Sequence, residues 1–122
     1  MMNVALLKNA GVDYDRGVKR FAGRAQLYER TLGKFQRDGT FARIRAAFEA
    51  GDRETLLASA HEFKGMCGNI ALPTLYEGAD ALVRMLRAGG YSEEALAGAY
   101  SRLAADYQTV YRAVCAAAED GK

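Results

Sequence analysis

Apolar side chains recur at alternating intervals of four and three residues over the last third of the chain. The members of this series are Leu96, Tyr100, Leu103, Tyr107, Val110 and Val114. Such heptad-like spacing places all six side chains along one face of an α-helix. A helix with one continuous apolar seam has to bury it against other helices, as in an antiparallel bundle. The series therefore predicts an all-α fold.

Capping and terminating residues divide the rest of the chain into further helical segments. Aspartate or serine precedes three of them, proline suits the first turn of another, and glycines follow several. We expect helices at 13–23, 24–50, 53–71, 73–89 and 92–118, with a frayed tail at 119–122. The prediction is one domain over residues 1–122, with its core at about 11–118. Its fold is an antiparallel four-helix bundle with a short additional N-terminal helix.

The 24–50 segment contains two apolar stripes that do not share a helical face. Tyr28, Leu32 and Phe35 form the first stripe, and Phe41, Ile44 and Phe48 form the second. On an ideal helix the two are out of phase by roughly half a turn. The segment therefore either buries a wide surface or bends or breaks near Asp38-Gly39-Thr40.

Composition and charge argue against several classes of protein. The net charge is +2 and basic residues are spread along the chain, which does not indicate nucleic-acid binding. No apolar run is long enough to cross a membrane and no signal peptide is recognisable, so we expect a cytoplasmic protein. Cys67 and Cys115 both fall on apolar helical positions, which favours reduced core thiols over a disulfide or a zinc site. No metal or other cofactor is expected.

The only histidine, His61, lies in the segment His61-Glu62-Phe63-Lys64-Gly65-Met66-Cys67-Gly68-Asn69. On a helix the apolar residues of this region share one face, namely Leu56, Ala60, Phe63, Cys67 and Ile70. The opposite face carries His61, Lys64, Gly65, Gly68 and Leu72. The apolar face suits a core, so the histidine is expected to face solvent.

Gly65 and Gly68 require an explanation, because a glycine in a helix interior costs about 1 kcal/mol relative to alanine. One explanation is that another molecule approaches the backbone closely beside His61. The other is that a neighbouring helix packs closely there. Under the first explanation, Leu57, Ala58, Gly65, Gly68 and Leu72 would form a partner-binding surface around His61.

His61 and Lys64 together suit phosphoryl transfer. A neutral imidazole is a nucleophile, and an ammonium one turn away can lie beside the same small anion. Phosphoryl transfer needs mainly an aligned nucleophile and positive charge around the moving oxygens. The chain has neither a P-loop nor another glycine-rich nucleotide loop. It therefore has the residues to hold a phosphoryl group but no recognisable means of taking one from ATP.

The stretch Ala60-His61-Glu62-Phe63-Lys64-Gly65, followed by Gly68, resembles the phosphorylation motif of histidine-containing phosphotransfer (HPt) domains. The runs Gly11-Val12-Asp13 and Ala50-Gly51-Asp52 are also similar to that family, and the resemblance covers roughly residues 11 to 90. It implies a four-helix bundle that relays phosphoryl groups between receiver domains. His61 would be the phosphoacceptor and Lys64 the phosphate-side cation. Gly65 and Gly68 would give the receiver access.

The resemblance also implies partners. These are response-regulator receiver domains and a hybrid sensor histidine kinase, with Mg²⁺ on the partner receiver only. The chain departs from the family pattern at Val83, where many members carry a glutamine or glutamate that hydrogen-bonds the site. Arg84 and Arg87 are the candidates to replace it. A second departure is Ala71, near which many members carry another glycine or small residue.

Two other functions remain open from the sequence. The chain could be the phosphoacceptor domain of a chemotaxis-type histidine kinase, phosphorylated by a kinase domain of the same protein. It could instead be a helical adaptor in which His61 is incidental. The double methionine at the start favours a self-contained protein. The glycines beside His61 favour phosphotransfer, because an adaptor has no need of them.

Overall fold

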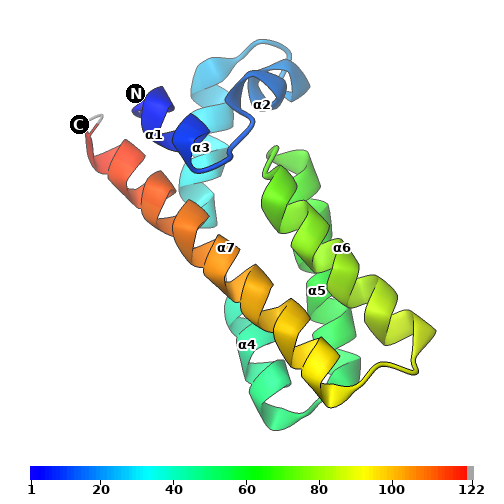
Figure 1. The fold of residues 1–122 in the computed structure, drawn as a ribbon. Helices are drawn as coiled ribbons and strands as arrows, with labels where there is room; N and C mark the ends of the chain where they lie inside the picture. The colour runs from blue at the N-terminus through cyan, green and yellow to red at the C-terminus, as the bar shows by residue number, and fades with distance from the viewer. Residues whose placement is uncertain (121–122) are drawn as a thin grey trace.

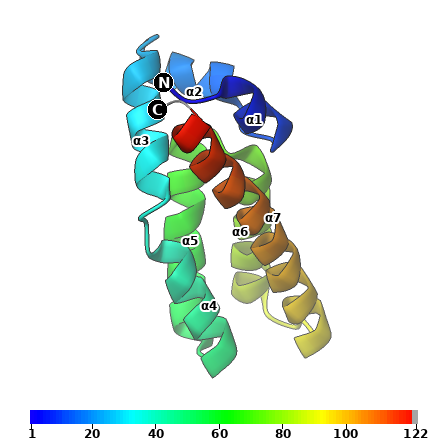
Figure 2. The ribbon, with the colours of Figure 1, turned by 90° about the vertical axis from the view of Figure 1, so that its left-hand side faces the viewer.

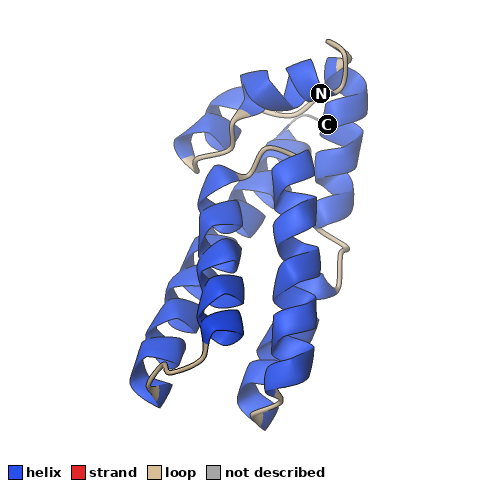
Figure 3. Ribbon diagram, turned by 90° about the vertical axis from the view of Figure 1, so that its right-hand side faces the viewer, coloured by secondary structure: helices blue, strands red, loops and turns tan. Residues whose placement is uncertain are grey.

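The computed structural model describes residues 1–120, which form seven α-helices and no β-strand (Figures 1 and 3). The helices are α1 (Val4–Asn9), α2 (Tyr14–Arg20), α3 (Ala25–Phe35), α4 (Thr40–Ala50), α5 (Arg53–Asn69), α6 (Pro73–Ala88) and α7 (Glu93–Asp120). The predicted all-α class is confirmed. In the described residues no helix is both long and apolar enough to cross a membrane.

Helices α4 to α7 form the bundle, and successive helices run in opposite directions (Figure 2). Helix α5 packs between α4 and α6, and α6 packs on α7. Helix α7 is the longest, and its C-terminal half extends beyond the bundle to contact α1 and α3 (Figure 1). The antiparallel bundle predicted from the sequence is therefore present.

Aromatic rings bridge α4 and α7 inside this bundle. The Phe41 and Tyr107 rings stack with their centroids 4.1 Å apart, and the Phe48 and Tyr100 rings stack at 4.0 Å. Phe63 of α5 meets Phe41 edge-on at 5.6 Å. These contacts confirm that the apolar series of the last helix faces the core, where its four aliphatic members are buried.

The 24–50 segment is broken, which is one of the two alternatives left by its out-of-phase stripes. Helix α3 ends at Phe35 and α4 begins at Thr40. The Asp38 carboxylate accepts a hydrogen bond of 2.8 Å from the Thr40 backbone N–H, satisfying a donor at the start of α4. Because the break resets the helical phase, both stripes reach the core, with Phe48 half-buried.

The N-terminal region contains more helix than the sequence suggested. The expected helix after Asp13 is α2, whose first turn this aspartate caps through the Arg16 backbone N–H. Helix α1 was not predicted. Asn3 caps it and also donates its backbone N–H to the Ala117 carbonyl at 3.1 Å, which ties α1 to the end of α7. The backbone N–H of Asp13 donates to the Ala71 carbonyl at 3.0 Å, so α2 is tied to the turn between α5 and α6.

Helices α5 and α7 begin with the capping residues predicted from the sequence. Asp52 accepts from the Thr55 backbone N–H, and Gly51 before it adopts a left-handed φ of +71°. Ser92 Oγ accepts from the Ala95 backbone N–H. Helix α7 continues to Asp120, so the expectation that the tail frays from residue 119 is wrong for 119 and 120. Residues 121 and 122 lie outside the described part of the chain.

Candidate functional site

His61 lies near the middle of α5, on the side that faces away from the bundle core. The five residues assigned to the opposite face are all buried, with exposed fractions of 4% or less. Burial of that face fixes the rotation of α5 and leaves His61 exposed. The position of the imidazole is therefore set by the packing of the bundle.

The His61 side chain is open to an approaching molecule. It takes part in none of the side-chain hydrogen bonds or ion pairs formed within residues 1–120. The neighbouring Glu62 pairs with Arg43 of α4 at 2.8 Å, and both of these side chains are more than half exposed. No contact within the described chain therefore competes for the ring nitrogens of His61.

Lys64 is held by a carboxylate from the next helix. Its Nζ atom lies 3.0 Å from Oδ1 of Asp80, whose Oδ2 lies 2.8 Å from an Arg84 Nη2 atom. The hydrogen bond from Lys64 holds the pKa of the Asp80 carboxyl below its usual range, and the charge of Arg84 adds to this effect. Two cations share one carboxylate, so the cluster retains a positive charge one turn from His61.

The side chain of Lys64 is partly buried against α6. The Lys64 side chain is only 22% exposed. Its Nζ atom also lies 5.7 Å from the centroid of the Tyr76 ring of α6, within the range of a cation–π contact. Lys64 is therefore positioned beside His61 by α6.

The two glycines of α5 have different surroundings. A Cβ atom added to Gly65 would have no neighbour within 4 Å, so the surface there is open. A Cβ atom added to Gly68 would lie 3.4 Å from two carbons of the Tyr76 ring. The open surface at Gly65 thus supports the first explanation, namely the close approach of another molecule beside His61. Gly68 also has a packing role beneath an aromatic side chain of the neighbouring helix.

Of the other predicted partner-binding residues, two lie at the outer surface and one lies in the core. Ala58 is exposed and Leu57 is half-buried, so both can contribute to an outer surface. The prediction for Leu72 is wrong, because this side chain is 1% exposed and belongs to the core. Helix α5 ends at Asn69 and Leu72 is the N-cap of α6, so the helical wheel of α5 does not extend to it.

The proposed replacements for the family's glutamine or glutamate are exposed residues of α6. Val83 itself is buried in the core. Arg84 reaches the site through its ion pair with Asp80. Arg87 is exposed and forms no ion pair within the described residues.

Sequence reasoning missed the two residues of α6 that contact Lys64, namely Tyr76 and Asp80. A signal was present, since Tyr76, Asp80 and Arg84 follow each other at intervals of four on one side of α6. Which helix such a stripe faces is not evident from its spacing. Among residues 1–120 no group of three or more histidine, cysteine, aspartate or glutamate side chains is placed to hold a metal ion.

The fold and this site define a class of protein: a helical bundle that presents one exposed histidine beside a fixed cation. The chain matches the family described as Hpt domain over residues 37–120, and it belongs to that family. The match covers α4 to α7 and the histidine motif, whereas the similarity noted for residues 11–36 lies outside it. Comparison with curated proteins and with solved structures gave no match.

Membership places the chain in two-component signalling, in which Hpt domains are phosphotransfer carrier modules and not kinase domains. Domains of this family interact with receiver domains and kinases.

Proposed function

We propose that His61 accepts a phosphoryl group and relays it between the aspartates of receiver domains in a multistep phosphorelay. The observation that carries the proposal is the exposed imidazole of His61 beside the open surface at Gly65, with Lys64 held one turn away. An aspartyl phosphate on a docked receiver can approach this surface without meeting a side chain at Gly65.

The chemistry requires little of the chain beyond this arrangement. The unprotonated ring nitrogen of His61 forms a bond to phosphorus while the bond from phosphorus to the aspartate oxygen breaks. The aspartate leaves as a carboxylate with the electron pair of that bond, and the phosphoryl group remains on the histidine. Transfer to a second receiver reverses these steps. Any Mg²⁺ belongs to the partner receiver, and the chain itself needs no cofactor.

Lys64 stabilises the negative charge of the moving phosphoryl oxygens. To reach these oxygens, the Lys64 ammonium leaves its ion pair with the Asp80 carboxylate and pairs with a phosphoryl oxygen instead. Asp80 keeps a cationic partner during this exchange, because Arg84 binds its other oxygen. The exchange therefore leaves no carboxylate without a partner.

The test is a transfer experiment with receiver domains from the same organism, each phosphorylated with radioactive phosphate. The wild-type chain should take label from at least one receiver and pass it to another, and His61→Gln should do neither. A parallel incubation with ATP and candidate histidine kinases tests the alternative. Label acquired only from a kinase would indicate the phosphoacceptor domain of a chemotaxis-type kinase. No label from either source would indicate a helical adaptor. Label from a kinase only, or no label at all, would each contradict the relay.

A further inference from the structure

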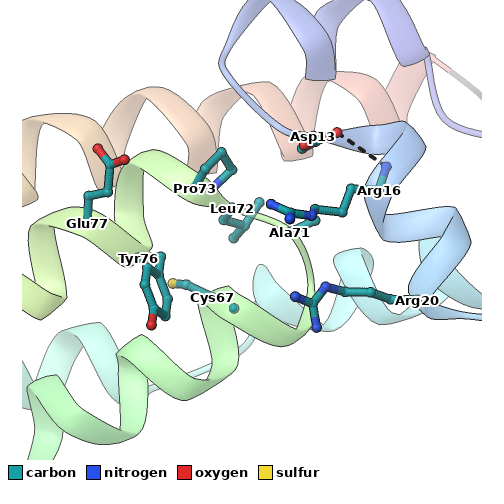
Figure 4. A pocket seen from close by; sticks show the side chains of 10 residues that line it. Asp13, Arg16, Arg20, Cys67, Ala71, Leu72, Pro73, Tyr76 and Glu77 are labelled. Carbon is teal, nitrogen blue, oxygen red and sulfur yellow. Dashed lines mark hydrogen bonds between the residues drawn. The ribbon is translucent and has the colours of Figure 1, made fainter.

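A second feature lies on the same side of α5 as His61. Beyond Gly68, the end of α5, the start of α6 and helix α2 enclose a cavity of about 320 Å³ (Figure 4). Gly68 is seven residues from His61, which is two helical turns, or about 10 Å along the axis. The cavity therefore opens on the side of the molecule that a partner of His61 has to approach.

The cavity has an apolar floor and a cationic wall. Cys67, Leu72 and Pro73 contribute to the floor, and Tyr76 of α6 closes one side. Arg16 and Arg20 extend from α2 on the other side, and both point toward the region where α5 ends and the turn to α6 begins (Figure 4).

The two guanidinium groups have no ion-pair partner in the part of the chain that the structure describes. Of the acidic residues that line the cavity, Asp13 caps α2 through the Arg16 backbone N–H. The Glu77 carboxylate points away from the arginines in Figure 4. The wall thus presents two guanidinium groups that form no ion pair within residues 1–120, beside an apolar floor.

We infer that this cavity is a second docking point for the receiver domain, and that it takes an acidic side chain of the receiver. The inference rests on the proposed function. A specific interface covers about 800 Å² on each partner, which corresponds to a radius of about 16 Å if it is roughly circular. A receiver centred on His61 therefore covers the cavity as well. A carboxylate is the occupant that complements two free guanidinium groups.

The arginines come from a part of the chain outside the family match. Helix α2 precedes residue 37, whereas His61, Gly68 and Tyr76 lie within the match. The docking point therefore combines a wall that lies outside the matched residues with a surface that lies within them. Such a wall discriminates between receivers, because a receiver without the acidic side chain leaves the arginines unpaired.

The test compares two double variants with the same change in charge. Arg16→Glu with Arg20→Glu reverses the wall of the cavity. Lys34→Glu with Arg112→Glu reverses two exposed cations of α3 and α7 that do not line it. For each variant three quantities are measured: thermal stability, labelling of His61 by a small phosphodonor such as phosphoramidate, and binding to a receiver that exchanges label with the wild type.

Reversing the wall should weaken receiver binding at least about tenfold, mainly through a slower association rate that is most evident at low salt. The control double variant should bind as the wild type does. A receiver in which the contacting acidic residue is changed to lysine should restore binding to the reversed wall. Labelling by the small donor requires no docking, so it measures the reactivity of His61 separately.

The inference is overturned if the double variant with the reversed wall binds the receiver as the wild type does. It is equally overturned if the control double variant loses as much affinity for the receiver. It is also overturned if the reversed wall lowers labelling by the small donor, because the arginines would then act on His61 itself. A wild-type chain that the small donor does not label at all would instead contradict the proposed function. The two failures are therefore distinguishable.

Discussion

At the scale of single residues, the positive charge beside His61 is the feature that can be altered most cleanly. Lys64→Ala should slow phosphoryl transfer to His61 by about tenfold, because the charge that stabilises the transferring oxygens is lost. The loss of its ion pair should lower the melting temperature slightly, with Asp80 still paired to Arg84. Rapid-quench kinetics with a phosphorylated receiver give the rate, and the exposed Lys34→Ala serves as control. An unchanged rate would remove Lys64 from the site.

The open surface at Gly65 gives a second prediction at this scale. Gly65→Gln should block transfer from receivers, because the new side chain occupies the space that the partner needs. The fold should become more stable by up to about 1 kcal/mol, since glycine is a poor helix former. Gly98→Gln on α7 is the matched control, because Gly98 is also helical and has no neighbour within 4 Å. Equal transfer by the two variants would show that receivers do not dock at Gly65.

At the scale of helices, the attachment of α2 to the rest of the molecule depends on Gly17. A Cβ atom there would lie 2.1 Å from the ring of Tyr28, which is fully buried and donates a hydrogen bond of 2.8 Å from its hydroxyl to the Ile70 carbonyl. Helix α2 therefore packs directly on an aromatic residue of α3 that also reaches the end of α5.

Gly17→Ala should destabilise the fold by about 1–3 kcal/mol, because the Tyr28 ring has to move within a packed core. Gly33→Ala in α3 is the control. Its Cβ atom would have its nearest neighbour at 3.9 Å, so improved helix propensity should stabilise the fold slightly. Urea unfolding of both variants measures the difference. A Gly17→Ala protein as stable as the wild type would show that Tyr28 has room to move.

Helices were predictable from the sequence wherever an apolar stripe was long. The break before Thr40 was one of two alternatives that the sequence left open, because the two stripes fell out of phase. Helix α1 was missed because it has only six residues and one buried side chain, Leu7, so it shows no periodicity. Leu72 was assigned to the wrong surface because the helical wheel of α5 was continued past the end of that helix. The contact of Lys64 with Asp80 joins two helices, which the pattern of a single helix does not reveal.

At the scale of the whole molecule, the stability of the fold should depend on pH through Asp80. Its pKa is lowered in the folded state, so its ion pairs stabilise the fold above the unfolded-state value of about 4. This contribution is lost as the pH falls below that value and the carboxyl becomes protonated. The gap in unfolding free energy between wild type and Asp80→Asn should therefore be larger at pH 7 than at pH 3. Thermal or urea unfolding at both pH values measures the gap, and an equal gap would contradict the lowered pKa.

Phosphorus NMR shows directly whether this bundle carries a phosphoryl group on His61. The wild-type chain, treated with a small phosphodonor, should give one phosphoramidate signal that survives in base and disappears in acid. His61→Gln should give no such signal while keeping its helical circular-dichroism spectrum. A signal that remains in the folded His61→Gln protein, or that survives acid in the wild type, would show that His61 is not the phosphoacceptor.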